Sequence, residues 1–304
     1  MQKTSSGKIP VILDTDIGGD IDDTWALAML LKCPELDLKL VSCCTGNTEY
    51  RARVTAKLLE VAGRTDVPVA TGPQQNQGEQ DQKLWVQGYK LTDYPGKVYA
   101  HAAQAIVDTI MASSVPVTLI AIGPMSVVAE ALDIEPKIAH KARLVAMAGN
   151  VKRLYQDCKV VIPEFNVKID VPASRKVFTA PWDITITPLD TCGKIRVSDE
   201  NYFAVRDSKD AIAKAVIDNY RPWFLAKKWE PHDFAKVTRS SILFDTVAVY
   251  LAYTEELLAM EDHKLVIRDD GLTDIDPSGK LMHCAIDWKD QAAFEKYLTQ
   301  RLIA

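Results

Sequence analysis

The sequence lacks the features that mark a membrane or secreted protein. It has no uncharged apolar run of about 18 residues, the length that a membrane-spanning helix needs. No apolar segment typical of a signal peptide precedes the first strand-like run. The six cysteines form no CxxC pair, so a zinc site is not expected, and no N-x-[ST] acceptor is present. We therefore expect a protein of the reducing cytoplasm.

An excess of positive charge is also absent. The formal net charge is −5, whereas a nucleic-acid or anionic-membrane partner would call for a basic stripe. Hydrophobic residues make up 47% of the chain and charged residues 25%, which is ordinary for a globular protein. With 304 residues, no repeat and no long linker, we expect one domain over 1–304 that buries a core without disulfides.

Short apolar runs alternate with segments of helical periodicity. Strands are expected at 8–14, 37–44, 67–70, 115–122, 142–149 and 182–190. Helices are expected at 22–33, 48–63, 103–113, 123–132, 173–179, 208–226, 241–258 and 291–303. This alternation predicts an α/β fold with an open, mainly parallel central sheet flanked by helices. In such folds ligands bind beyond the carboxyl ends of the strands, so polar residues at strand ends are the first candidates for a site.

Five aspartates follow the first predicted strand within the ten residues DTDIGGDIDD, at 14–23. Gly18 and Gly19 permit a tight loop there. Carboxylates packed so closely repel each other, and a hard divalent cation such as Ca²⁺, which prefers oxygen ligands, is the simplest way to hold them together. An aspartate at the start of the next helix could cap that helix, but capping accounts for one carboxylate and not for five. The segment therefore predicts a metal site.

A phosphatase of the haloacid dehalogenase type is an alternative interpretation of the same segment. Such enzymes also carry DxD after the first strand, and the first aspartate, here Asp14, is then the nucleophile. They usually have Thr or Val two residues after the second aspartate, where this sequence has Gly18. The pair Asp22–Asp23 also has no role in that chemistry. The alternative predicts magnesium-dependent release of phosphate.

The DxD and DD elements resemble the opening of the inosine–uridine nucleoside hydrolase superfamily. Further similar segments follow in the same order and extend the resemblance over about 11–252. They are CCTGN (43–47), GPMSVVAEAL (123–132), PEFNVKIDVPASRKVF (163–178), ITITPLDTC (184–192) and SSILFDTVAVYLA (240–252). The resemblance implies a Rossmann-like fold and a calcium-dependent hydrolase that cleaves the N-glycosidic bond of ribonucleosides.

The resemblance also implies a set of metal ligands. Asp16 corresponds to a ligand that is also the base activating a calcium-bound water. Asp23 and Asp245 correspond to carboxylate ligands, and Ser126, within one residue, to a main-chain carbonyl ligand. A plainer interpretation of Asp245 is the N-cap of a helix, which is compatible with a ligand role. Negative groups suit this reaction, because glycosidic cleavage passes through an oxocarbenium-like transition state.

Four residues correspond to the family's ribose contacts: Asp22, Asn47, Glu164 and Asn166. Their side chains offer the donors and acceptors that ribose hydroxyls need. Asn47 follows a glycine and could also be an ordinary turn residue. Glu164 and Asn166 could be surface loop residues, although their i, i+2 spacing lets both face one way on an extended segment.

The spacing of the aspartates departs from the DxDxxxDD of the family. Strict counting from Asp16 puts Asp20 in the place of the first aspartate of the pair. A two-residue insertion instead keeps Asp22 and Asp23 as the pair, and we prefer it because the pair then leads into the helix WALAMLL. Asp20 remains an alternative to Asp22 as the ribose contact.

The leaving-group end departs further. Phe244 stands where many members carry the histidine that protonates the leaving base, and an apolar ring cannot donate a proton. Gln87, in VQGYKL, replaces the histidine of an early His-Gly segment, and Cys158 replaces an asparagine expected about six residues before Glu164. His232 and Tyr89 are alternative donors.

An aromatic group lies just upstream of His232 and could stack on a base. It consists of Tyr220, Trp223, Phe224 and Trp229. The first three share helical spacing, so the plainer interpretation places them in the core. A protein that binds calcium and ribose without turnover is a third hypothesis, since the acid is missing. The expected partner is a small nucleoside substrate, and the resemblance alone implies a homodimer or homotetramer.

Overall fold

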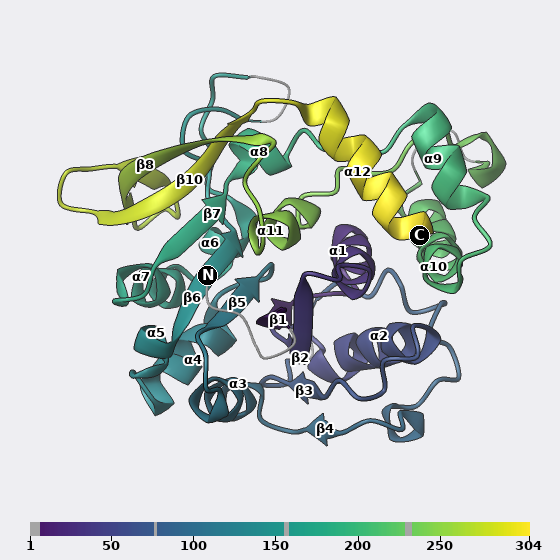
Figure 1. The fold of residues 1–304 in the computed structure, drawn as a ribbon, viewed down its shortest axis with the longest axis horizontal. Coiled ribbons are helices and arrows are strands. Elements are labelled where there is room, and N and C mark those ends of the chain that lie inside the picture. The colour runs from purple at the N-terminus through teal and green to yellow at the C-terminus, as the bar shows by residue number, and fades with distance from the viewer. Residues whose placement is uncertain (1–6, 76–77, 155–157, 229–232) are drawn as a thin grey trace.

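A single ten-stranded sheet forms the centre of the described part of the chain (Figure 1). The computed structural model describes residues 7–75, 78–154, 158–228 and 233–304. The strand order is β4-β3-β2-β1-β5-β6-β7-β10-β8-β9. Within the described ranges, no helix combines the length and the apolar content that crossing a lipid bilayer requires.

The first seven strands are parallel to one another. They are β1 (Ile9–Thr15), β2 (Leu36–Cys43), β3 (Val69–Thr71), β4 (Val98–Tyr99), β5 (Val117–Ala121), β6 (Ala142–Met147) and β7 (Ile184–Thr187). Every residue of β1 is buried, which is expected of a central strand covered on both faces. The predicted α/β fold with a mainly parallel sheet is confirmed.

The sheet carries an antiparallel extension at one edge. β10 (Lys280–Trp288) pairs parallel with β7 and antiparallel with β8 (Leu258–Ile267), and β9 (Thr273–Ile275) pairs antiparallel with β8. The sequence did not predict these strands. The helix expected over 241–258 is wrong: α11 covers only Thr246–Leu251, and β8 begins at Leu258.

Helices cover both faces of the sheet (Figure 1). One face carries α3 (Ala102–Ala112), α4 (Ser126–Ile134), α5 (Ile138–Lys141) and α7 (Val171–Thr179). The other carries α1 (Asp22–Leu31), α2 (Thr48–Val61), α9 (Asp199–Arg206), α10 (Ala211–Lys227), α11 and α12 (Gln291–Ile303). Val11 and Leu13 of β1 belong to one core and Ile12 to the other, because alternate side chains of a strand point to opposite faces.

Several short elements fill the strand ends and connections. They are α6 (Phe165–Ile169), α8 (Leu189–Cys192) and the 3-10 turns η1 (Leu91–Asp93) and η3 (Phe234–Lys236). The order of the sheet reverses between β1, which continues to β2, and β5, which continues to β6. Such a reversal leaves a crevice at the carboxyl ends of the strands. The aspartate segment follows β1 at this position.

Candidate active site

A cavity of about 780 Å³ opens at the carboxyl ends of the parallel strands. Its wall includes residues within two positions of the ends of β1, β2, β5 and β7: Asp16, Thr45, Ile122 and Leu189. Helix starts and loops provide the remaining walls. The volume lies within the range of about 300–1,000 Å³ that is usual for small-molecule sites.

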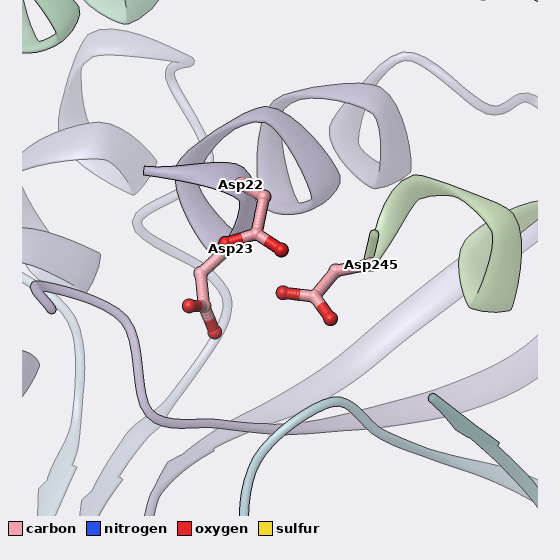
Figure 2. A group of neighbouring side chains, drawn as sticks. All are labelled: Asp22, Asp23 and Asp245. Carbon is pink, nitrogen blue, oxygen red and sulfur yellow. The ribbon is translucent and has the colours of Figure 1, made fainter. Parts of the chain in front are cut away.

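Three buried carboxylates meet in this cavity. Asp22 and Asp23 begin α1, and Asp245 precedes α11. One oxygen of each lies within 4.8 Å of one oxygen of the others, and Figure 2 shows the three side chains turned toward a common point. Each residue is only 3–4% exposed. The fold thus joins two residues of the first loop to a residue more than 200 positions later in the sequence.

Burial raises the pKa of Asp22, Asp23 and Asp245 well above the usual range, and repulsion from neighbouring aspartates raises these pKa values further. Three carboxylates in so small a volume are unfavourable unless a positive charge joins them. All the donors are hard oxygens, which is the ligand set that Ca²⁺ and Mg²⁺ prefer. The arrangement therefore fits a hard divalent cation.

Asp16 lies beside this cluster and also lines the cavity. Burial raises its pKa, while the Arg51 guanidinium, with Nη2 3.6 Å from Oδ2 of Asp16, acts in the opposite direction. The Thr15 hydroxyl donates a hydrogen bond to Asp23. Asp16 and Asp23 are thus held by groups of the same loop and of α2.

The loop between β1 and α1 is fixed by four side chains. Four successive main-chain carbonyls, of residues 17–20, each accept a hydrogen bond from a different residue. The pairs are Arg51 Nη1 to Ile17 at 3.0 Å, Tyr50 Oη to Gly18 at 3.0 Å, Trp223 Nε1 to Gly19 at 3.0 Å and Gln82 Nε2 to Asp20 at 2.6 Å. The loop is two residues longer than the family's DxDxxxDD spacing would make it. Because its buried carbonyls are hydrogen-bonded, it holds the aspartates in place without the free-energy cost of unpaired carbonyls.

The two predicted alternatives within this loop occupy different positions. Asp22 lies in the carboxylate cluster with Asp23 and Asp245. Asp20 also lines the cavity, but it is exposed, and its Oδ1 accepts a hydrogen bond from the Ile21 N–H at 2.6 Å. The geometry therefore agrees with a two-residue insertion that leaves Asp22–Asp23 as the pair.

Glu164 and Asn166 line the same cavity and are buried. Glu164 accepts hydrogen bonds from the main-chain N–H groups of Gly149 and Asn166 at 3.0 and 2.7 Å. Burial raises the pKa of Glu164 to about 7 in spite of these bonds. The Asn166 amide donates to the carbonyls of Ile122 and Met147, both at 3.1 Å, so it is fixed against the ends of β5 and β6.

Two predicted site residues lie beside the cavity and not in its wall. Asn47 is the N-cap of α2, where its Oδ1 accepts from the Tyr50 N–H at 2.9 Å. Its neighbours Thr45 and Gly46 line the cavity. Ser126 is the first residue of α4, and Pro124, two residues earlier, is a lining residue. The ribose contact of Asn47 and the metal contact of Ser126 therefore stay predictions.

The predictions for the leaving-group end are mostly corrected. Trp223 has no exposed surface and binds the Gly19 carbonyl, so its stacking on a base is wrong for this structure. Gln87 is exposed on the 72–98 connection and lies outside the cavity wall. The Tyr89 hydroxyl donates to Glu60, also away from the cavity. Phe244 does line the cavity, next to Asp245, while His232 lies outside the described residues.

The phosphatase alternative does not fit the position of Asp14. This residue is fully buried, is not part of the cavity wall and accepts a hydrogen bond from the Ser42 hydroxyl at 2.6 Å. Burial raises its pKa to about 7, which also disfavours the ionised form that a nucleophile needs. Asp14 therefore links β1 to β2 through Ser42 and does not line the cavity.

Sequence reasoning missed the residues that hold the site from other elements. Arg51, Gln82 and Tyr50 support the loop, and Glu79 and Lys227 line the cavity. The first three bind carbonyls of the loop that lie 32 to 62 residues away in the sequence, and no periodic pattern reveals such contacts. Lys227 had one signal, since it directly follows the helix predicted over 208–226, which carries three of the four aromatic residues.

Comparison with known sequences identifies the family of the chain. The profile of inosine-uridine preferring nucleoside hydrolases matches residues 11–295. The non-specific ribonucleoside hydrolase RihC of Klebsiella pneumoniae is 31% identical over 244 residues, which cover 76% of this chain and 78% of that protein. The pyrimidine-specific ribonucleoside hydrolase RihA of Escherichia coli is 28% identical over 234 residues, which cover 73% and 74%.

Solved structures share the fold over nearly the whole chain. A plant nucleoside hydrolase superposes with a TM-score of 0.78 at 20% identity, covering 97% of this chain and 99% of that one. The inosine-uridine preferring nucleoside hydrolase of Bacillus anthracis gives a TM-score of 0.76 at 19% identity, covering 97% and 99%. The chain belongs to the inosine-uridine preferring nucleoside hydrolase family, and it is an N-glycosyl hydrolase.

Proposed function

We propose that this protein hydrolyses the N-glycosidic bond of ribonucleosides, or of a related N-riboside, to ribose and free base in a calcium-dependent reaction. One observation carries the proposal: three buried carboxylates lie within 4.8 Å of one another in a cavity at the strand ends. The sequence relatives named as ribonucleoside hydrolases support the same substrate class.

Asp23 and Asp245 of this cluster, together with Asp16 beside it, are the side chains that would hold Ca²⁺, with the main-chain carbonyl of Ser126 as a fourth contact. Asp22 would lie next to the cation and face the ribose. When bound, the cation neutralises the repulsion between these carboxylates and makes a water at the site easier to deprotonate. Asp16 lines the cavity beside the cluster, so its carboxylate is placed to take a proton from the attacking water.

The ribose would lie across the carboxylate side of the cavity. Asp22 would offer it acceptors from the start of α1, and Glu164 and Asn166 from the N-cap and first turn of α6. Asn47, the N-cap of α2, lies in the segment that follows β2. Fixed groups of this kind orient the sugar before reaction. Negative charge around the anomeric carbon stabilises the oxocarbenium character that develops there.

Release of reducing sugar from uridine, cytidine, inosine and adenosine tests the proposal. The purified protein is assayed with about 1 mM EDTA, and then with Ca²⁺ or Mg²⁺ added in excess over the EDTA. We expect ribose release that EDTA abolishes and Ca²⁺ restores better than Mg²⁺. Turnover that EDTA leaves unchanged would contradict the metal requirement, and calcium-dependent nucleoside binding without turnover would favour the non-catalytic alternative.

The remaining properties follow as proposals of the same kind. One continuous sheet spans the described chain, which supports a single domain over 1–304. All six cysteines are unpaired, which supports a reducing, cytoplasmic location. A homodimer or homotetramer is proposed from the family, and sedimentation of the purified protein tests it.

A further inference from the structure

Phe244 stands where many members of the family carry the histidine that donates a proton to the leaving base. A departing base gains negative charge on its ring nitrogen, so a nearby N–H or O–H donor speeds its departure. Among the described residues, five side chains of the cavity wall carry N–H donors. They are Arg51, Gln75, Asn166, Lys168 and Lys227.

Two of these donors are occupied by the protein itself. Arg51 donates to the Thr45 and Ile17 carbonyls at 2.9 and 3.0 Å and also pairs with Asp16. The amide of Asn166 is bound to two main-chain carbonyls. Gln75 accepts the Gly46 N–H at 3.2 Å through its Oε1, so its amide N–H groups are only neutral donors, which stabilise an anion less than a charged donor does. The two lysines remain.

Lys227, the last residue of α10, is the lysine that the structure holds in place. Its Nζ lies 3.0 Å from Glu79 Oε2 and 2.7 Å from Asp81 Oδ2, and 5.4 Å from the centre of the Trp223 ring. The side chain is 23% exposed. Lys168, on α6, is exposed, and no ion pair to it is found in the described ranges. A fixed cation costs less to align with a developing charge than a mobile one.

The ammonium of Lys227 persists at neutral pH. Burial alone favours the neutral amine, but hydrogen bonds to Asp81 and Glu79 outweigh it and raise the pKa of Lys227 above its usual range. A group with so high a pKa transfers its proton poorly but is an effective hydrogen-bond donor and positive charge. Lys227 therefore differs in kind from a histidine acid.

We propose that Lys227, positioned by Glu79 and Asp81, is the catalytic group that stabilises the departing base by a charged hydrogen bond. This inference rests on the proposed hydrolase function. Since an ammonium only donates, it selects leaving groups that present an acceptor, such as a ring nitrogen or a carbonyl oxygen.

The step balances without any further reagent. The C1′–N bond breaks, and both of its electrons go to the base nitrogen, where Lys227 stabilises the anion. The water oxygen bonds to C1′, and Asp16 takes the proton of that water. Asp16 returns this proton to solvent and the base anion gains one from solvent, so the products are ribose and neutral base.

The test compares two substrates that differ in their need for a donor. Uridine has a poor leaving group, whereas 4-nitrophenyl β-ribofuranoside releases a stable phenolate without help. We expect Lys227→Met to lower kcat with uridine by about 10²–10³-fold and with the nitrophenyl riboside by less than about 5-fold. Lys227→Arg keeps the charge and should restore most of the uridine activity.

Three further variants separate the explanations. Asp81→Asn should lower uridine turnover less than Lys227→Met does and again spare the nitrophenyl riboside, which a merely structural loss would not do. Lys214→Met, on the exposed side of α10 where Lys214 pairs with Asp218, is the matched charge control and should leave both rates unchanged. Lys168→Met should leave the substrate ratio unchanged.

Equal losses on both substrates for Lys227→Met would overturn the inference, and so would an uridine-specific loss for Lys168→Met instead. Failure of the proposed function has a different signature: the unaltered protein would then hydrolyse neither riboside.

Discussion

At the scale of single residues, the site depends on two close approaches: that of the buried carboxylates to one another, and that of Gly123 to the backbone of Asp16. Asp22, Asp23 and Asp245 are buried together, which is unfavourable for the protein alone and favourable once a cation binds. Gly123, two residues after the end of β5, has no Cβ, and this permits close contact with the backbone of Asp16. A Cβ at this position would lie 2.9 Å from the Asp16 nitrogen and 2.6 Å from the Cys44 sulfur.

Gly123→Ala should therefore displace Asp16. We expect kcat to fall by at least about 10²-fold, because a displacement of about 1 Å in catalytic geometry has effects of this size. The free energy of unfolding should fall by about 1–3 kcal/mol through overpacking. Gly19→Ala is the contrast, since its Cβ meets no atom closer than 3.8 Å. Steady-state kinetics and urea unfolding of both variants check this, and equal effects would contradict it.

From the sequence, residues of this site could be predicted only where a residue type suited to the chemistry stands at the end of a predicted strand or the start of a predicted helix. Asp23 and Asp245 were expected as metal ligands and Asp22 as a ribose contact, and the structure places one oxygen of each within 4.8 Å of the others. For Trp223, the helical spacing favoured a core position over stacking on a base, and the ring is indeed fully buried. Gln87 was misplaced because the 72–98 connection has no regular pattern that fixes its path over the cavity.

At the scale of elements, the β1–α1 loop is a rigid part of the site. Side chains from α2, α10 and the connection before η1 bind its carbonyls, so the loop keeps one conformation although it contains two glycines. The Tyr50 hydroxyl has two bonds, since it donates to the Gly18 carbonyl and accepts from the Gln82 N–H, both at 3.0 Å.

Tyr50→Phe removes both bonds and keeps the ring. We expect calcium affinity or kcat to fall by about 10–100-fold, the usual effect of losing a group that orients metal ligands. Tyr253→Phe, which loses a hydroxyl bond to Tyr297 far from the cavity, is the matched control. Calcium titration calorimetry measures the affinity. A Tyr50→Phe variant with unaltered affinity and kcat would show that the loop does not need this support.

The elements themselves were predictable where the apolar pattern is strong. The six predicted strands and the C-terminal helix exist, and α12 has the predicted bounds. The antiparallel strands were missed because β8 is buried mainly at its ends and carries exposed polar residues between them, so its pattern lacks a regular alternation. The segment expected as one helix over 241–258 is divided instead, since α11 ends at Leu251, residues 252–257 contain turns and polar side chains, and β8 begins at Leu258.

At the scale of the whole molecule, the buried acids link stability to pH and to metal. Burial raises the pKa of Asp14 and of Glu164 to about 7, and the pKa values of the three clustered aspartates are also raised. The folded protein without metal therefore holds more protons than the unfolded chain above about pH 4. Its stability is expected to fall as pH rises from about 4 to 7.

Calcium should reverse this trend, because it binds the ionised carboxylates. We expect the rise in Tm on adding Ca²⁺ to be several degrees larger at pH 8 than at pH 5.5, where protons compete with the metal. Thermal unfolding of the chelator-treated protein at both pH values, with and without Ca²⁺, measures it. A shift that is the same at both pH values would mean that the buried carboxylates do not form the metal site.

The most direct test of the account is uridine hydrolysis by Asp16→Asn at saturating Ca²⁺. Asparagine keeps the size of the side chain and its oxygen but cannot accept the proton of the attacking water. We predict that kcat falls by at least about 10³-fold, with the fold retained, because the variant loses both the base and a charged ligand. Full activity in this variant would show that Asp16 is not the base and that the site works by another route.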